Sequence, residues 1–128
     1  MSLSEARVHA ALPASDLERA KNFYEQKAGL TPKGETSGGL IYEGAGGTRF
    51  LLFPSFGAAS GTHTQVGFLV ADAEAEVAEL RSRGVVFEEY DLPGFKTEGG
   101  IITDGETRSA FFKDSEGNLV GLVQSADL

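Results

Sequence analysis

The chain begins with a short stretch in which apolar and polar side chains alternate, at residues 7–12. Such alternation is typical of a β-strand with one buried face. We predict a strand that ends at Pro13, because proline has no N–H to donate to a neighbouring strand. The alternation predicts that Val8, Ala10 and Leu12 contact a helix and that the residues between them face the other way.

A helical pattern follows this strand. Ser15 and Glu18 have the spacing of a capping box, in which the two residues satisfy each other's backbone N–H groups at the start of a helix. Apolar residues then recur at helical spacing, and a glycine follows that suits the left-handed conformation of many helix ends. The predicted helix carries the apolar residues Leu17, Ala20, Phe23 and Tyr24 and ends at Gly29.

The same strand and helix pattern returns in the second half of the chain. Residues 8–16 match residues 64–72 at a constant separation, so that His9 corresponds to Gln65 and Asp16 to Asp72. Asp72 is the expected cap of the second helix, and a glycine again follows the helical pattern. Internal duplication strongly constrains a fold. The expected inward-facing residues and end of this second helix are Val77, Leu80 and Gly84.

Glycine-rich turns divide the rest of each half into strands. In the first half we predict strands at residues 31–36, 40–43 and 48–54, and in the second half at residues 87–91, 108–113 and 119–124. Residues 90–106 have no counterpart in the first half and are a candidate for specificity. Each half therefore has the order βαβββ. We predict one α+β domain over residues 1–128, made of module 1 (about residues 5–57) and module 2 (about residues 61–126).

One helix can cover only one face of each predicted sheet. Two curved sheets that come together would leave their other faces to line a common groove. Strand alternation predicts the groove-facing residues Arg7, His9, Ala11, Arg49, Leu51, Phe53, His63, Gln65, Gly67, Leu69, Leu119, Gly121 and Val123. Further aromatic candidates for its wall are Phe56, Tyr90, Phe95 and Phe111.

The composition excludes several kinds of chemistry. The 128 residues include no cysteine, so neither a disulfide nor a thiolate metal site nor a cysteine nucleophile is available. The formal net charge of −8 repels phosphate backbones, and we expect no nucleic-acid partner. No apolar run approaches the ~20 residues of a membrane span. No secretory leader opens the sequence, and we therefore expect a cytoplasmic protein.

Three segments together carry a family resemblance. They are His9 followed by SDLERAKNFYEQKAGL, then QVGFLVADAEAEVAELRSRG, and finally AFFKDSEGNLVGLVQ. In their order and duplication they resemble the vicinal oxygen chelate superfamily, which contains glyoxalase I, bleomycin-resistance proteins and extradiol dioxygenases. The resemblance implies paired βαβββ modules around a groove, and it also implies a homodimer.

Metal-using members of this superfamily hold a divalent cation with side chains from the first and last strands of each module. The resemblance places these four positions on His9, Leu51, Gln65 and Gly121. Two of them have no donor atom, whereas a catalytic metal normally has about three protein ligands. We predict that no metal occupies this position. A displaced site that uses His63, on the same face as Gln65, is the alternative.

Two functions follow from the resemblance. The first is a metal-independent protein of the bleomycin-resistance type that binds a partly aromatic, neutral or cationic small molecule. The expected contacts of this molecule are His9, Arg49, Phe53 and Gln65, and residues 90–106 are expected to close over it. Because Arg49 would favour an acidic ligand unless a carboxylate neutralises it, the ligand's charge stays open. The second is a metal-dependent lyase, isomerase or dioxygenase, and the sequence leaves open whether any turnover occurs. A regulatory or interaction module is a third alternative without a specific feature.

Overall fold

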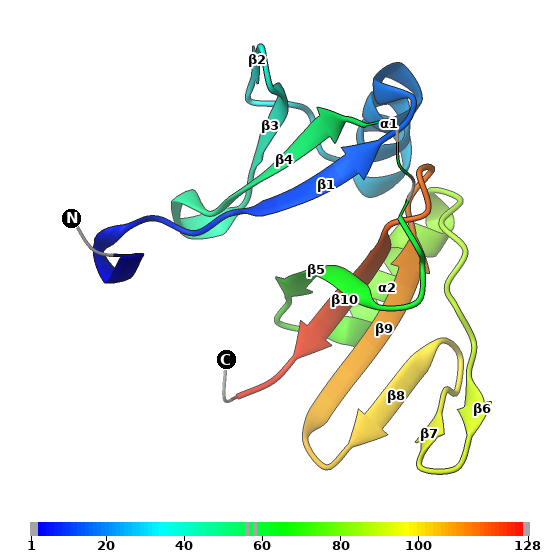
Figure 1. Ribbon diagram of the computed structural model, residues 1–128. Coiled ribbons are helices and arrows are strands. Elements are labelled where there is room, and N and C mark those ends of the chain that lie inside the picture. The colour runs from blue at the N-terminus through cyan, green and yellow to red at the C-terminus, as the bar shows by residue number, and fades with distance from the viewer. Residues whose placement is uncertain (1–2, 56, 58, 127–128) are drawn as a thin grey trace.

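The computed structural model describes residues 3–55, 57 and 59–126, and in this part of the chain two four-stranded sheets form the body of the protein (Figure 1). The first sheet has the order β1-β4-β3-β2 and the second the order β5-β10-β9-β8. In each sheet the first and last strands of the module pair in parallel and the other pairs are antiparallel. This shared topology confirms the two βαβββ modules. The strands are β1 (Ala10–Ala14), β2 (Gly34–Thr36), β3 (Gly39–Glu43), β4 (Arg49–Pro54), β5 (Thr64–Leu69), β8 (Ile101–Asp104), β9 (Thr107–Lys113) and β10 (Leu119–Gln124).

One α-helix belongs to each module. Helix α1 (Leu17–Phe23) continues into a π-helical turn (Tyr24–Ala28), and α2 (Ala73–Ser82) follows β5. Short 3₁₀ turns lie at Leu3–Glu5 and Ala45–Gly47. The predicted cap at Asp72 is confirmed, since its carboxylate accepts a hydrogen bond from the Ala75 N–H at 3.1 Å. The predicted helix ends are also confirmed, because Gly29 and Gly84 have φ of 74° and 95°.

The predicted capping box at the start of α1 is wrong. Asp16 is the cap, and its carboxylate accepts from the Arg19 N–H at 3.0 Å. The Ser15 hydroxyl instead donates to Glu116 of module 2 at 3.2 Å. A contact between modules therefore takes the place of the local bond that the Ser15 and Glu18 spacing predicted.

The predicted end of the first strand is also wrong. Strand β1 starts at Ala10 and runs through Pro13, which lies opposite Phe53 of β4. Proline is tolerated there because β1 is an edge strand, with a neighbour on one side only. Leu12 is buried as expected, but Val8 precedes the strand and is 93% exposed, so it does not contact the helix.

The second strand of module 2 differs from the sequence prediction. Residues 87–91 do not form a strand of the second sheet: Phe87 makes an isolated bridge with Phe112, and Asp91 belongs to the separate strand β6. The strand is β8, which lies inside the segment that was expected to be an insertion. The rest of that segment forms a small hairpin of β6 (Asp91–Leu92) and β7 (Phe95–Lys96), beyond the edge of the second sheet (Figure 1). The missed signal is the Asp104-Gly105 pair, which is typical of a tight hairpin turn.

Aromatic side chains join the cores of the two modules. Tyr42 and Phe50 stack at 4.9 Å between ring centroids inside module 1. Phe50 then meets Phe68 of β5 edge-to-face at 5.9 Å, and Phe23 of α1 lies 6.3 Å from Phe112 of β9. Aromatic pairs at such distances add to the stabilisation from apolar burial. The helix-facing sides of the two sheets therefore share a continuous apolar contact.

A polar connection reinforces this contact. The turn between β9 and β10 lies against the start of α1, where the buried Glu116 carboxylate accepts from the Asp16 N–H at 2.9 Å and from Arg19 Nε at 2.7 Å. The hydrogen bond from Arg19 is the main reason why the pKa of Glu116 falls to about 2. Nearby, the buried Tyr24 hydroxyl donates a hydrogen bond to the Asp114 carboxylate at 2.7 Å. Burial is the main reason why the pKa of Tyr24 is raised well above its ordinary value. These bonds fix module 2 against module 1.

Candidate functional site

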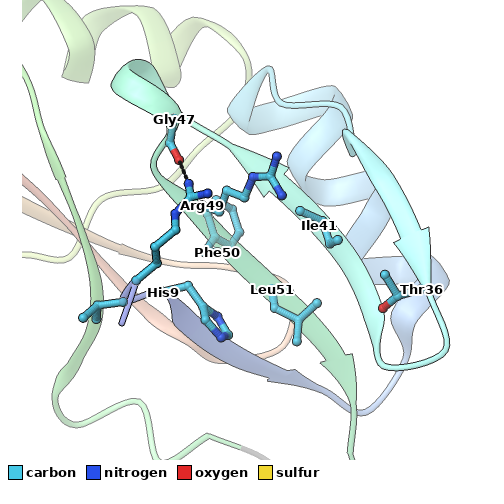
Figure 2. A pocket seen from close by; sticks show the side chains of 9 residues that line it. His9, Thr36, Ile41, Gly47, Arg49, Phe50 and Leu51 are labelled. Atoms are coloured by element: carbon cyan, nitrogen blue, oxygen red, sulfur yellow. Dashed lines mark hydrogen bonds between the residues drawn. The ribbon is translucent and has the colours of Figure 1, made fainter. Parts of the chain in front are cut away.

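A pocket of about 370 Å³ lies on the side of the first sheet that faces away from α1. Leu12 and Leu52 pack toward the helix, so the alternate residues of these strands face outward. Leu51 lies between Ala11 of β1 and Ile41 of β3 in the strand register, and the side chains of Leu51 and Ile41 form the apolar floor of the pocket (Figure 2). The residues that line the pocket are Arg7, Val8, His9, Thr36, Ile41, Gly47, Arg49, Phe50 and Leu51.

Three polar side chains also line this pocket. His9 Nδ1 lies 3.1 Å from the Ala10 carbonyl oxygen, so Nδ1 carries a proton and Nε2 is left to accept a hydrogen bond from a ligand when the ring is neutral. Arg7 Nη2 donates to the Gly47 carbonyl at 3.1 Å, the bond dashed in Figure 2. Arg49 pairs with Glu43 at 3.2 Å. The carboxylate that would neutralise Arg49 is therefore present.

A second pocket, of about 190 Å³, lies on module 2. Its wall includes three aromatic rings, with centroid separations of 5.2 Å for Tyr90 and Phe95, 6.1 Å for Tyr90 and Phe111, and 6.4 Å for Phe95 and Phe111. Phe95 comes from the small hairpin. His63 lines the same pocket, with Nδ1 3.2 Å from Ser60 Oγ. Partial burial is the main reason why the pKa of Tyr90 is raised, so its phenol stays protonated at neutral pH.

The predicted wall residues thus fall into two pockets that share no lining residue. His9, Arg49 and Leu51 lie together on module 1, whereas His63, Tyr90, Phe95 and Phe111 lie together on module 2. The predicted groove-facing residues that line neither of these pockets are Ala11, Phe53, Gln65, Gly67, Leu69, Gly121 and Val123. Phe56 lies outside the described residues.

Three of these positions, Phe53, Gln65 and Gly121, have different surroundings. Phe53 is half-buried and follows Leu51 on the same face of β4. The side-chain oxygen of Gln65 is buried and has no hydrogen-bond partner among the described residues. Gly121 is buried, and a Cβ there would lie 3.3 Å from the Thr64 methyl group and 3.4 Å from the Phe111 ring. Close packing around Gly121 therefore leaves little room for a larger side chain.

Five residues line the pocket without being predicted as groove residues from the sequence: Val8, Thr36, Ile41, Gly47 and Phe50. Ile41 could have been found, because Leu40 and Tyr42 belong to the buried face of β3 and the residue between them must face the other way. For Thr36 the sequence carries no signal, since its place depends on how the β2–β3 turn folds over the sheet.

The superfamily's metal positions do not fit a divalent cation in this chain. His9 immediately precedes β1 and Leu51 lies in β4 of the first sheet, whereas Gln65 and Gly121 lie in β5 and β10 of the second sheet. Of these four residues only His9 and Gln65 have side-chain donor atoms. Within residues 3–55, 57 and 59–126, no three histidine, cysteine, aspartate or glutamate side chains come together in a way that could hold a metal ion. His63, the candidate for a displaced site, lines a different pocket from His9.

A match to a family model identifies the class of this protein. The family model described as Glyoxalase/Bleomycin resistance protein/Dioxygenase superfamily matches residues 7–122. The chain therefore belongs to this superfamily, the vicinal oxygen chelate group that its sequence motifs resemble. No curated protein sequence matches the chain closely enough to count as a relative.

Solved structures of this superfamily have a similar fold. The chain is 21% identical to a glyoxalase/bleomycin resistance protein/dioxygenase from Alicyclobacillus acidocaldarius, with a TM-score of 0.71 and coverage of 99% of this chain and 96% of the other. It is 25% identical to TnmS3, described as an antibiotic binding protein from Streptomyces sp. CB03234, with a TM-score of 0.64 and coverage of 94% and 98%.

A third similar structure is the fosfomycin resistance protein FosX from Listeria monocytogenes. It is 15% identical, with a TM-score of 0.69 and coverage of 95% of this chain and 94% of the other. None of the helices in the described part of the chain has the length and apolarity that crossing a bilayer requires.

Proposed function

We propose that this protein binds an amphipathic small molecule in the pocket of module 1 and does so without a divalent metal. The observation that carries the proposal is the pocket itself, whose lining combines an apolar floor of Ile41 and Leu51 with the polar groups of Arg7, His9 and Arg49. Concave apolar sites with a few placed polar groups are the usual form of ligand pockets. We place the protein in the cytoplasm, which cell fractionation tests.

Two further observations support this proposal. The superfamily's metal positions carry Leu51 and Gly121, which cannot ligate a cation, whereas Leu51 adds to the apolar floor. Each Å² of apolar surface that a ligand removes from water contributes about 25 cal/mol. The similar protein TnmS3 is described as antibiotic-binding, so a fold of this kind accommodates such a role. Binding rather than turnover is therefore the activity that we propose.

The first prediction concerns the apolar floor. Replacing Leu51 with alanine is expected to weaken binding of any ligand found by a thermal-shift screen by about 5-fold, because part of one leucine's contact area is lost. Calorimetric titration measures the change. Leu92→Ala is the matched control, since Leu92 is 58% exposed on the small hairpin. Equal affinities for both variants and the parent protein would place the site elsewhere.

The second prediction concerns metal. Purified protein is expected to contain no stoichiometric zinc, nickel, manganese or iron, and chelation is expected to leave ligand binding unchanged, because two of the four superfamily positions lack a donor. Elemental analysis and calorimetry before and after chelation test this. A catalytic activity that zinc, nickel or manganese restores after chelation would instead establish the metal-dependent lyase, isomerase or dioxygenase.

We also propose a homodimer. Between the modules lies a crevice of about 390 Å³ with the apolar wall residues Phe50, Val66, Phe68 and Leu69, and Leu69 is 58% exposed. A second copy that covers this crevice would remove the apolar surface from water.

The third prediction tests this association. Light scattering is expected to give about twice the 13.5 kDa mass of one chain, and Leu69→Lys is expected to shift the mass toward that of one chain, because a charge would be buried in the contact. Leu92→Lys is the control. A single-chain mass for the parent protein across a concentration series would contradict the dimer.

A further inference from the structure

We propose that the pocket of module 1 selects carboxylate ligands with an apolar body and that Arg7 is the residue that binds the carboxylate. This inference rests on the proposed function and narrows it to one chemical class. It assigns the ligand a negative charge, where the sequence predicted a neutral or cationic ligand and left the charge open because of Arg49.

The ion pairs among the described residues leave one of the two pocket arginines without a carboxylate partner. Arg49 is paired with the Glu43 carboxylate through both Nε and Nη2, each 3.2 Å from the same oxygen. Arg7 bonds to the Gly47 carbonyl, which carries no formal charge. None of the ion pairs formed among the described residues involves Arg7. Because one positive charge remains, a monoanion complements the pocket better than a neutral molecule or a cation.

The geometry of Arg7 suits a carboxylate. Its guanidinium has five N–H donors in a planar fork, and the bond to Gly47 uses only one Nη2 hydrogen while anchoring the group at the pocket. Arginine can donate two parallel hydrogen bonds to a carboxylate, and charge-assisted bonds are about twice as strong as neutral ones. An anchored guanidinium also loses less conformational entropy when it binds a ligand.

The rest of the pocket requires an apolar body on the same ligand. Ile41 and Leu51 form the floor, and Phe50 also lines the pocket. The formal net charge of −8 repels small anions at long range, although salt screens this repulsion over about 8–10 Å. An anion without apolar area gains too little from one arginine to overcome that repulsion. We therefore expect acetate and inorganic phosphate to bind far more weakly than an aromatic acid.

Three probes of nearly equal shape separate charge from apolar contact. 1-Naphthoate is an anion, 1-naphthamide is neutral, and 1-naphthylmethylamine is a cation. Titration of isotope-labelled protein, followed by amide chemical shifts, is expected to show naphthoate binding about 10-fold more tightly than the amide, and the amine more weakly still. The largest shifts are expected at Ile41 and Leu51, which lie in the pocket floor.

Variants then test the role of Arg7. Arg7→Gln is expected to lower naphthoate affinity about 10-fold and leave amide affinity unchanged, whereas Arg7→Lys, which keeps the charge but loses the planar fork, is expected to lower naphthoate affinity by less than Arg7→Gln does. Arg108→Gln is the matched control, because it removes one positive charge from module 2, where Arg108 pairs with Glu74. Glu43→Gln is expected to tighten naphthoate binding several-fold, since it frees the charge of Arg49.

The outcomes separate this inference from the proposed function. Equal affinity for naphthoate and naphthamide, or equal losses in Arg7→Gln and Arg108→Gln, would overturn the selection of carboxylates but leave a ligand pocket. If none of the three probes shifts Ile41 or Leu51 at millimolar concentration, both the inference and the proposed pocket fail. A gain of affinity in Glu43→Gln would be difficult to obtain from a purely structural effect, so it gives the strongest support.

Discussion

Replacing Gly39 with alanine is expected to destabilise the protein by about 3 kcal/mol or more. Gly39 begins β3 with φ of 137°, a backbone conformation that residues with a side chain rarely adopt. A Cβ at this position would lie 2.1 Å from the Leu52 carbonyl oxygen and 2.9 Å from the Phe53 Cα. Both atoms belong to the backbone of β4, so relief of the clash would require the β3–β4 ladder to open.

Gly34→Ala is the matched control for this change. Gly34 lies in β2 of the same hairpin, opposite Ile41, and a Cβ there would meet nothing within 4 Å. We expect this variant to lie within about 0.5 kcal/mol of the parent protein. Urea unfolding curves measure both values. Similar stabilities for Gly39→Ala and Gly34→Ala would show that the strand register near Gly39 differs from the one described here.

The loss at Gly39 is also expected to affect the pocket. Ile41 follows two residues later and lies opposite Leu51 in the register, so movement of β3 would disturb the pocket floor. If Gly39→Ala still folds at low temperature, its affinity for 1-naphthoate is expected to fall as well. Gly34→Ala is expected to retain the affinity of the parent protein.

Most of the fold follows from local patterns in the sequence. The alternation along β4 placed Phe50 and Leu52 in the core and Arg49 and Leu51 on the opposite face, as the burial pattern shows. The cap at Asp72 and the glycine end at Gly84 followed from helix chemistry that acts within one turn. Such features are predictable because the interactions that cause them join residues close in sequence.

The features that the sequence did not predict depend on distant contacts. Strand β8 was missed because its pairing with β9 competes with an equally β-compatible segment at residues 87–91. The true cap of α1 was missed because Ser15 is recruited by Glu116, 101 residues away. The separation of the wall residues into two pockets depends on how the sheets are placed. No spacing in the sequence encodes that placement.

Glu116 carries the second large expected effect. Its carboxylate is 1% exposed and accepts hydrogen bonds from the Ser15 hydroxyl, the Asp16 N–H and the Arg19 guanidinium, all of which belong to the start of α1. Glu116→Ala is expected to cost about 2 kcal/mol of unfolding free energy, since several donors lose a charged acceptor. We expect less than for a fully buried ion pair, because the Arg19 side chain is 54% exposed to water.

Glu79→Gln is the control for this prediction. Glu79 pairs with Arg83 one helical turn away in α2, and their side chains are 58% and 43% exposed. Exposed ion pairs of this kind contribute about 0.3–0.5 kcal/mol, so the variant should unfold almost like the parent protein. Equal losses for Glu116→Ala and Glu79→Gln would contradict the role of Glu116 in joining the two modules.

The pH dependence gives a further test of Glu116. In the folded protein its pKa is about 2, against an ordinary value of 4.5, chiefly because Arg19 donates to the carboxylate. The ionised carboxylate therefore stabilises the fold fully above about pH 4.5, and this contribution is lost as the pH falls toward about 2. The stability difference between the parent protein and Glu116→Gln is expected to shrink over that interval, as measured by urea unfolding at each pH. A difference that stays constant from neutral pH to pH 3 would show that the charge of Glu116 contributes nothing to holding the modules together.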